Sequence, residues 1–170
     1  MKRFLFFLLT VFTLSASAQT TEPVLKFGFL SYDTIIQSMD DYAFVESGMQ
    51  ALQEQYAAEQ KRVEDEFNKK YEEFLDGQRD FPQTILQKRQ MELQELMEKN
   101  IAFTKESQRL LVEAREKAMQ PLKSRLADAL ARVGSSRGLA FIINTDQNAL
   151  PWMNITMGED VTEAVLEALK

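Results

Sequence analysis

A long, charged segment with almost no glycine, from Asp40 to Arg132, constrains most strongly how this chain can fold. It is interrupted once, by the sequence DGQRDFP at residues 76–82, and each half has the apolar periodicity of a helix. Two long helices joined by one tight turn either fold back as a hairpin or stay apart. Short apolar segments flank this stretch at 25–30 and 139–143. The pattern predicts a small body carrying a long helical arm, a shape that favours holding or spacing over catalysis.

The first eighteen residues have the features of an export signal that is cleaved off. Lys2 and Arg3 give a positive start, and residues 4–14 form an apolar run too short to span a bilayer. Residues 15–18 read SASA, which supplies the small side chains that signal peptidase requires. We therefore expect residues 1–18 to be the signal peptide of an exported protein. An uncleaved membrane anchor is the alternative.

Composition limits the classes of function open to the mature chain, residues 19–170. Without the signal it has 18 basic and 26 acidic residues, a net charge of −8, which disfavours binding to nucleic acid. It has no histidine and no cysteine, so the commonest general base, thiol nucleophile and zinc ligands are missing. It also has no glycine-rich phosphate loop. We expect a protein that is not an enzyme, holds no cofactor or metal, and has no disulfides to brace it.

The first arm helix is expected from Tyr42 to Leu75. Its apolar residues recur at spacings of eleven, as at Tyr56 and Phe67, which corresponds to about 3.67 residues per turn. The apolar stripe therefore runs almost straight along the helix, and the opposite face is charged. The stripe consists of Val45, Met49, Leu52, Tyr56, Val63, Phe67, Tyr71 and Phe74, with Gln60 as its one polar member.

The second arm helix is expected from Pro82, which suits a helix start, to Val133. Pro121 lies inside this helix, removes a backbone hydrogen bond and predicts a bend where arm meets body, so it is the candidate hinge. A passive bend is the alternative. Gly134 and Gly138 are expected to end the helix. The seam follows heptad spacing through Leu93, Leu96, Asn100, Phe103, Ser107, Leu110 and Ala114, and continues at Ala118, Leu122, Leu126, Ala129 and Val133.

Folding the arm about residues 78–80 pairs residues whose numbers sum to about 160. Tyr56 then meets Phe103, and Gln60 meets Asn100. Gln60 and Asn100 are polar residues on otherwise apolar stripes, and an Asn–Gln layer would fix the register at some cost in stability. We therefore expect Gln60 and Asn100 to lie in one layer of the arm, which spans residues 45–118.

Five apolar residues beside the seam or at the turn are candidates for binding other chains. They either widen the seam or form an adhesive wall for unfolded apolar segments. Methionine suits the second role because its side chain adapts to many shapes. The five residues are Met97, Ile101, Leu111, Val112 and Phe81.

The remaining segments, 19–44 and 119–170, form the expected body, which is rich in β-structure. Residues 24–30 and 139–143 have the composition of strands, and 149–152 is expected to pair with the second of them as a short third strand. So few strands leave open edges, and so small a core without disulfides favours self-association. We therefore expect a homo-oligomer.

Two short helices complete the expected body. One is expected at 35–39, directly after the first strand. The other is expected at 161–169, where Asp160 and Glu163 have the spacing of a capping box.

From residue 24 to residue 170 the chain resembles the OmpH-like (Skp) family of periplasmic chaperones. The resemblance rests on the order and spacing of KFGFLSYDTIIQSM, two long charged helices, GLAFIINTDQNAL and the ending DVTEAVLEALK. It implies an α+β, mostly helical homotrimer, in which small β bodies form an oligomeric core and two-helix coiled-coil arms surround a cavity. It also implies a periplasmic holdase that binds unfolded outer-membrane proteins in that cavity without ATP. The trimer contacts that it implies are Phe27, Phe29, Leu30, Ile35, Ile36, Phe141, Ile142, Ile143, Val161, Val165 and Leu166.

Charge is the one departure from this family pattern. The resemblance implies basic arms that attract acidic outer-membrane chains and anionic lipid, whereas this chain is acidic. Binding of anionic lipid or lipopolysaccharide is therefore not expected. The alternative function is a periplasmic coiled-coil spacer or adaptor. In such a protein the seam would bury the apolar residues of the arm, and the rigid arm would dock on an envelope protein.

Overall fold

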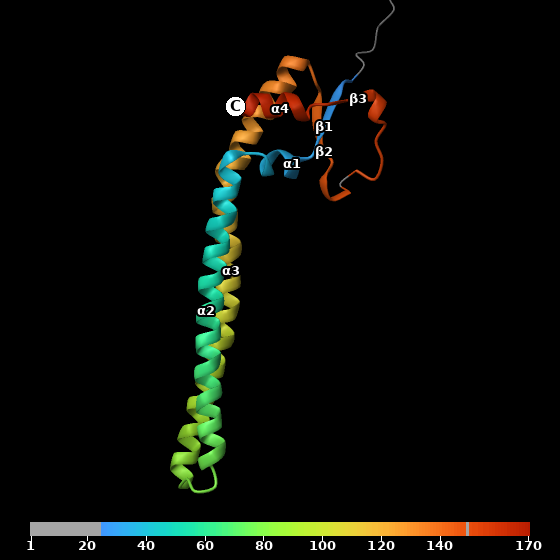
Figure 1. The fold of residues 1–170 in the computed structure, drawn as a ribbon. Coiled ribbons are helices and arrows are strands. Elements are labelled where there is room, and N and C mark those ends of the chain that lie inside the picture. The colour runs from blue at the N-terminus through green and yellow to red at the C-terminus, as the bar shows by residue number, and fades with distance from the viewer. Residues whose placement is uncertain (1–24, 149) are drawn as a thin grey trace, which may run out of the picture.

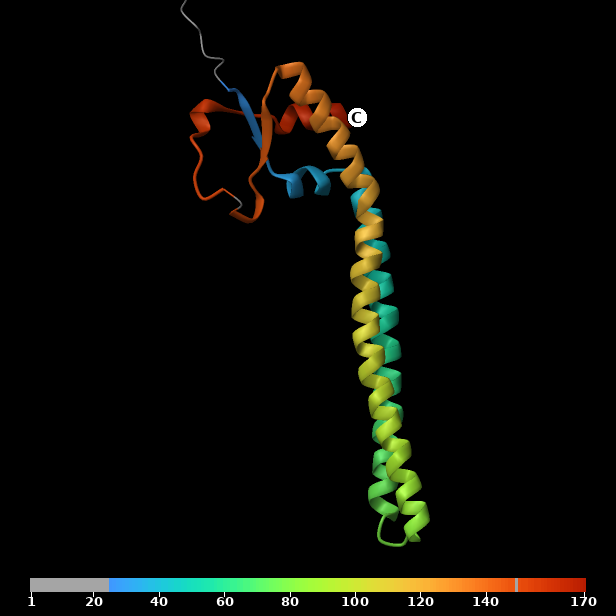
Figure 2. The same ribbon diagram turned by 180° about the vertical axis from the view of Figure 1, so that it is seen from behind.

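The computed structural model describes residues 25–148 and 150–170 and has the α+β, mostly helical architecture that the sequence predicts. Two long helices, α2 (Asp40–Gly77) and α3 (Gln83–Arg137), run side by side as an arm that leaves a small body at one end (Figure 1). Figure 2 shows from behind that the two helices stay together down to the turn at the tip. The predicted signal peptide, residues 1–18, lies outside the described residues.

The arm helices begin and end close to the predicted residues. Asp40 and Asp41 in the first turn of α2 place negative charge at the positive end of the helix dipole. Helix α3 ends at Gly138, whose φ of 63° is the left-handed conformation that glycine adopts most easily. The prediction that Gly134 also ends the helix is wrong. Helix α3 continues through Gly134, whose carbonyl accepts the N–H of Leu139 at 2.9 Å and so completes the C-terminal cap.

An aromatic ring closes the turn at the arm tip. The ring of Phe81 lies directly over Gly77, so a larger residue at position 77 would collide with it. The N–H of Asp80 also donates to the Gly77 carbonyl at 3.0 Å. Phe81 is half-buried, and this contact gives it a structural role in the turn.

The body contains a parallel sheet of three strands in the order β2-β1-β3. The central strand is β1 (Phe27–Leu30), flanked by β2 (Phe141–Asn144) and β3 (Gly158–Asp160). The prediction of a third strand at 149–152 is wrong, because residues 150–152 lie in irregular structure and Ala149 is outside the described residues. The third strand instead forms six residues later and pairs with the first strand rather than the second.

Helix α1 (Tyr32–Gln37) follows the central strand directly. It begins earlier than the predicted 35–39 because the Ser31 hydroxyl caps it, accepting the N–H of Thr34 at 3.1 Å. The cap leaves Ile35 and Ile36 within the helix and turned toward the core.

Helix α4 (Thr162–Leu169) ends the chain and begins without the predicted capping box. Val161 occupies the N-cap position, and Asp160 instead accepts the N–H of Thr162 at 2.9 Å in a local turn. Two short 3-10 helices lie in the connection before this helix. They are η1 (Asp146–Asn148) and η2 (Ile155–Met157).

Helices α1, α3 and α4 supply most of the body core, which they build with the central strand and the residues next to them. Apolar side chains at heptad spacing on α3 fill its middle, as the seam pattern predicts. The buried apolar residues of the core are Leu30, Ile35, Ile36, Met39, Leu122, Leu126, Ala129, Val133, Val161 and Val165.

The burial of these residues bears on the expected trimer contacts. Five of the expected residues have at most 7% of their surface exposed within a single chain. Side chains buried this deeply in their own core cannot form the surface that another copy touches. The five residues assigned to the core of the single chain are Leu30, Ile35, Ile36, Val161 and Val165.

The second face of the sheet lies outside this core, and we call it the open sheet face. It is formed by Phe27, Phe29, Phe141 and Ile143, because Phe27 lies beside Phe141 and Phe29 beside Ile143 in the parallel register. The rings of Phe27 and Phe141 stack at 5.7 Å, and Phe141 is 50% exposed. Four of the expected trimer contacts therefore share the face of the sheet that lies outside the core of the described residues. The other two, Ile142 and Leu166, are half-buried against the core.

Candidate functional site

The two arm helices pack in the register that their aromatic residues predict. The ring centroids of Tyr56 on α2 and Phe103 on α3 are 6.3 Å apart. Farther along α3, Ser107 is buried in the seam, where a small residue lets the two helices approach closely. The hairpin is thus a packed two-helix coiled coil, and its register follows from the positions of a few large and small side chains.

The two polar residues predicted to share one layer of the seam make hydrogen bonds to other partners. The Asn100 amide donates across the arm to the backbone carbonyl of Val63 at 3.1 Å. The Gln60 amide instead donates to Glu64 on its own helix at 3.0 Å. Val63 is three residues from Gln60 on α2, so Asn100 contacts α2 within one turn of Gln60, and of these two side chains it is Asn100 that bonds across the arm.

Three apolar residues of α3 are exposed along one side of the arm, and we call them the arm flank. They are Met97, Ile101 and Val112, with exposed fractions of 47%, 63% and 66%. Residues four and eleven apart lie on one side of a helix, so these side chains form one stripe. The contact between α2 and α3 therefore leaves these apolar residues of the arm exposed to solvent. Three of the five predicted binding residues therefore share one accessible surface.

The arm flank lies on the side of α3 from which the body extends. Steps of seven residues lead from Val112 to Met119, Leu126 and Val133, and each step rotates the position by only about 20°. Leu126 and Val133 are buried in the body core, and Met119 packs against its edge. The exposed flank is therefore the continuation, below the body, of the face that α3 turns toward the core.

Leu111 differs from the other candidates for binding. It is half-buried next to the seam residue Leu110, so it widens the contact between the helices. The structure thus separates the five predicted residues into the three of the arm flank, one at the seam and one at the turn. Contact of any of them with another chain stays a prediction.

Two ion pairs join the arm helices near the body. Arg125 contacts Asp41 at 2.6 Å, and Arg115 contacts Glu46 at 2.6 Å. The other ion pairs within the arm join residues of one helix in the part of the chain that the structure describes. Exposed pairs of this kind contribute modestly to stability, so they mainly fix the geometry of the arm base.

Sequence reasoning missed a hollow at this base, on the side of the arm away from α1. The hollow has a volume of about 390 Å³ and a mostly apolar lining that includes Met49, Pro121 and Leu122. Phe44 stands at its edge with 81% of its surface exposed. In the sequence, the hollow was indicated by Phe44, an apolar residue next to Val45 of the apolar stripe.

Helix α3 is continuous through Pro121, and the role of that residue as a hinge stays a prediction.

The cations of the arm are largely neutralised by neighbouring carboxylates. Arg62 lies between Glu59 and Glu66, at 2.8 and 3.2 Å, and its hydrogen bond holds the pKa of Glu59 below its usual value. The same arrangement recurs at Arg109, whose hydrogen bond lowers the pKa of Glu106. Local pairing of this kind leaves little positive potential for a polyanion.

The carboxylates of the body have structural partners. The Asp146 carboxylate accepts the N–H of Asp33 at 2.9 Å and so ties the loop after β2 to the start of α1. Within residues 25–148 and 150–170, no cluster of carboxylates has the arrangement of a metal site. None of the helices described combines the length and the apolarity needed to cross a membrane.

Comparison with known proteins relates this geometry to one family. The family model described as outer membrane protein (OmpH-like) matches residues 26–169. The fold resembles the solved structure of a candidate outer membrane chaperone (OmpH-like) from Caulobacter crescentus CB15, with a TM-score of 0.63. The two chains are 16% identical, and the match covers 85% of this chain and 82% of the other. A search of curated protein sequences finds no match.

Proposed function

Since the chain belongs to the OmpH-like family of outer membrane proteins, we propose that it is a periplasmic holdase chaperone that keeps unfolded outer-membrane proteins from aggregating. The arm flank is the observation that carries this proposal. A folded arm with no client has no structural need for Met97, Ile101 and Val112 to be exposed along one side. An unfolded chain that still exposes its apolar residues would bury them against this stripe.

Binding through the flank consists of many weak contacts. Met97 and Val112 are 15 residues apart along α3, or roughly 22 Å at 1.5 Å per residue. Each covers a small area, so one arm alone holds a client weakly, and several arms acting together hold it firmly. Methionine in this stripe adapts to clients of different sequence. Release then needs no nucleotide, because each contact opens separately.

Assembly into a homotrimer would supply the several arms. The open sheet face and the outer edges of β2 and β3, which pair with no other strand of the described residues, support self-association, because parallel sheets are normally covered on both faces. Three bodies joined through these surfaces would hold three arms around one space. The flank lies on the side of the arm from which the body extends, which would turn it toward that space.

The charge of the chain shapes the choice of partner. A net charge of −8 after export and the paired cations of the arm disfavour anionic lipid, lipopolysaccharide and nucleic acid. Capture of clients would therefore depend on apolar contact, and salt would affect it little. A holdase of this kind uses no cofactor and performs no chemistry.

The proposal is tested by diluting a urea-unfolded outer-membrane barrel protein into buffer with the purified mature protein. A molar excess of the protein should suppress light scattering, and gel filtration should show a soluble complex. Aggregation that proceeds unchanged at several-fold excess, with no complex, would contradict the holdase function. Addition of ATP should change neither result.

A structural spacer is the second candidate, and the arm base favours it. The ion pairs from Asp41 to Arg125 and from Glu46 to Arg115 stiffen the junction, and the hollow beside Phe44 offers a surface for an envelope protein. A spacer needs no client and no exposed flank. Failure of the aggregation test together with a rigid arm in solution would select this function.

A further inference from the structure

Methionine is the sulfur-bearing side chain that an oxidant meets in this protein. The chain has eight methionines and no cysteine. Met39 and Met49 have at most 9% of their surface exposed, whereas Met91, Met97 and Met157 are 70%, 47% and 65% exposed. An oxidant must reach the thioether to react with it, so the exposed methionines are open to oxidation and those of the core are protected.

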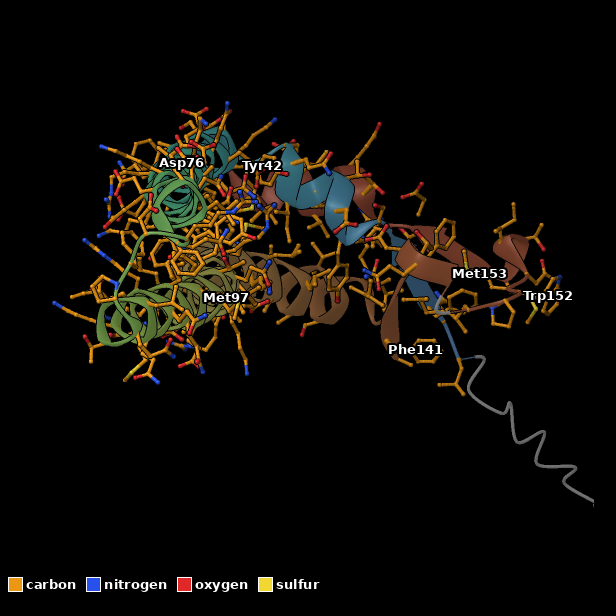
Figure 3. All side chains as sticks on the ribbon, turned by 90° about the horizontal axis from the view of Figure 1, so that it is seen from below. Tyr42, Asp76, Met97, Phe141, Trp152 and Met153 are labelled. Atoms are coloured by element: carbon orange, nitrogen blue, oxygen red, sulfur yellow. The ribbon has the colours of Figure 1, made fainter. Side chains whose placement is uncertain are left out.

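Met97 occupies an uncharged part of the arm surface. Residues three and four positions away are its neighbours on the helix, and none of the four carries a charge. They are Leu93, Gln94, Asn100 and Ile101. Figure 3, seen from below, shows Met97 on the arm and Met153 in the body, well apart from it. A chemical change at Met97 therefore acts on the arm flank and leaves the body as it is.

We propose that Met97 is an oxidation site through which peroxides weaken the binding of unfolded clients. This inference rests on the proposed holdase function and adds a means of regulating it. With hydrogen peroxide, the sulfur lone pair attacks one peroxide oxygen and the O–O bond breaks. The departing hydroxide takes the proton of the transferred hydroxyl and leaves as water. The sulfur loses two electrons to the peroxide, and the side chain becomes methionine sulfoxide.

The sulfoxide oxygen makes the arm flank a poorer surface for an apolar client. The thioether is apolar and adaptable, whereas the sulfoxide is a polar group that water solvates. An apolar client segment that covers Met97 would strip this water and offer no hydrogen-bond donor in return. Binding should therefore fall several-fold for each arm, and the losses multiply where several arms hold one client.

Met91 provides a matched control on the same helix. It is more exposed than Met97, so peroxide reaches it at least as readily. It lies six residues earlier, which places it about 120° around the helix from Met97. Its neighbours on the helix include Lys88 and Glu95. A sulfoxide at Met91 joins a surface that is already charged, so client binding should not change.

The experiment compares the wild type with Met97→Leu and Met91→Leu, because leucine is apolar, similar in size to methionine and not oxidised by peroxide. Each protein is treated with dilute hydrogen peroxide, the peroxide is removed, and peptide mass spectrometry measures the sulfoxide at each position. Suppression of aggregation of a urea-unfolded outer-membrane barrel protein is measured before and after. Oxidation should lower the activity of the wild type and of Met91→Leu several-fold. Met97→Leu should keep the activity of the untreated protein.

Two further measurements do not depend on the leucine variants. Met97→Gln introduces a polar side chain of similar length and should weaken client binding without peroxide, whereas Met91→Gln should not. Methionine sulfoxide reductases A and B, one for each sulfoxide epimer, should restore the oxidised wild type in the presence of dithiothreitol. Circular dichroism should show unchanged helix content throughout, because Met97 lies outside the buried core.

The outcomes separate this inference from the proposed function. Untreated wild type that does not suppress aggregation would overturn both. Suppression by the untreated protein, with an equal loss on oxidation in the wild type and in Met97→Leu, would overturn the role of Met97 and leave the holdase function standing. Full activity of the wild type despite sulfoxide at Met97 would do the same. A loss that Met97→Leu prevents and the reductases reverse would support the inference.

Discussion

The side-chain amide of Asn100 donates a hydrogen bond of 3.1 Å to the backbone carbonyl of Val63, and this bond joins the two arm helices at mid-length. The Val63 carbonyl also lies inside a regular helix, where it accepts a bond from the residue four positions later. The Asn100 bond is therefore an addition to the helix, and its main effect is to select one register of α3 against α2.

Replacing Asn100 with leucine should raise the free energy of unfolding by about 1 kcal/mol, because the apolar side chain gains more from burial than the lost hydrogen bond contributed. The register should become less defined at the same time, seen as a broader distribution of distances between spin labels on the two helices. The control is Gln60→Leu, which removes a bond within α2 and should leave the distribution narrow. A broadening of equal size in both variants would contradict the role given to Asn100.

Replacing Leu126 with alanine should lower the free energy of unfolding by about 2–5 kcal/mol, since the side chain is 2% exposed in the body core and leaves a cavity. Leu75→Ala on the arm, where the side chain is 43% exposed, is the matched control and should cost far less. Urea unfolding of both variants provides the measurement. Equal losses would mean that α3 does not pack into the body as described.

Stability should depend on the charge of Asp146 at low pH. Hydrogen bonds from the Ser31 hydroxyl and the Asp33 N–H hold the pKa of this carboxyl below its usual value. Folding thus favours the carboxylate. Its contribution is present above the unfolded pKa of about 3.9 and is lost as pH falls through the lower folded pKa.

The variant Asp146→Asn should therefore be less stable than the wild type at neutral pH, and the difference should shrink in acid. Urea midpoints of both proteins, measured from neutral pH to below pH 3.9, give the comparison. A difference that stays constant over this range would show that the hydrogen bonds do not depend on the charge.

Replacing Met97 and Ile101 with serine should weaken the suppression of aggregation without unfolding the arm. Both side chains are exposed, and surface substitutions usually change stability by no more than about 0.5 kcal/mol. The control is Ile85→Ser with Met91→Ser, which removes the same two residue types from exposed positions outside the flank. Dilution assays should show a clear loss for the first variant and little for the second. If both variants suppressed aggregation equally well, the arm flank would not be the surface that binds the client.

The arm could be predicted almost completely from the sequence because the pattern that specifies each helix lies within the helix itself. Apolar spacings of seven and eleven residues place both helices, and the single turn then sets the register that brings Tyr56 to Phe103. The hydrogen-bond acceptor of Asn100 could not be predicted in the same way. A backbone carbonyl is present at every residue, so a pattern of side chains cannot show that it will be the acceptor.

The body was predicted less well because its contacts join distant segments. The strand at 158–160 reads GED, which has little strand propensity and forms only because it pairs with β1. The pattern also could not separate Leu30, which faces the core, from Phe29, which faces outward, without the register of the sheet. Phe44 was missed for a similar reason, since the hollow beside it is lined by residues of both α2 and α3 and so depends on how the two helices pack at the arm base.

A photo-reactive residue placed on the arm tests most directly whether the flank holds unfolded clients. One protein carries it at Ile101 on the flank, and the matched control carries it at Ile85, which is also exposed on α3. Each is mixed with an unfolded outer-membrane barrel protein during dilution from urea, irradiated and analysed by denaturing gel. A strong cross-link to the client is expected from position 101 and a weak one from position 85. Equal cross-linking from both positions, or none from position 101, would contradict client binding by the flank.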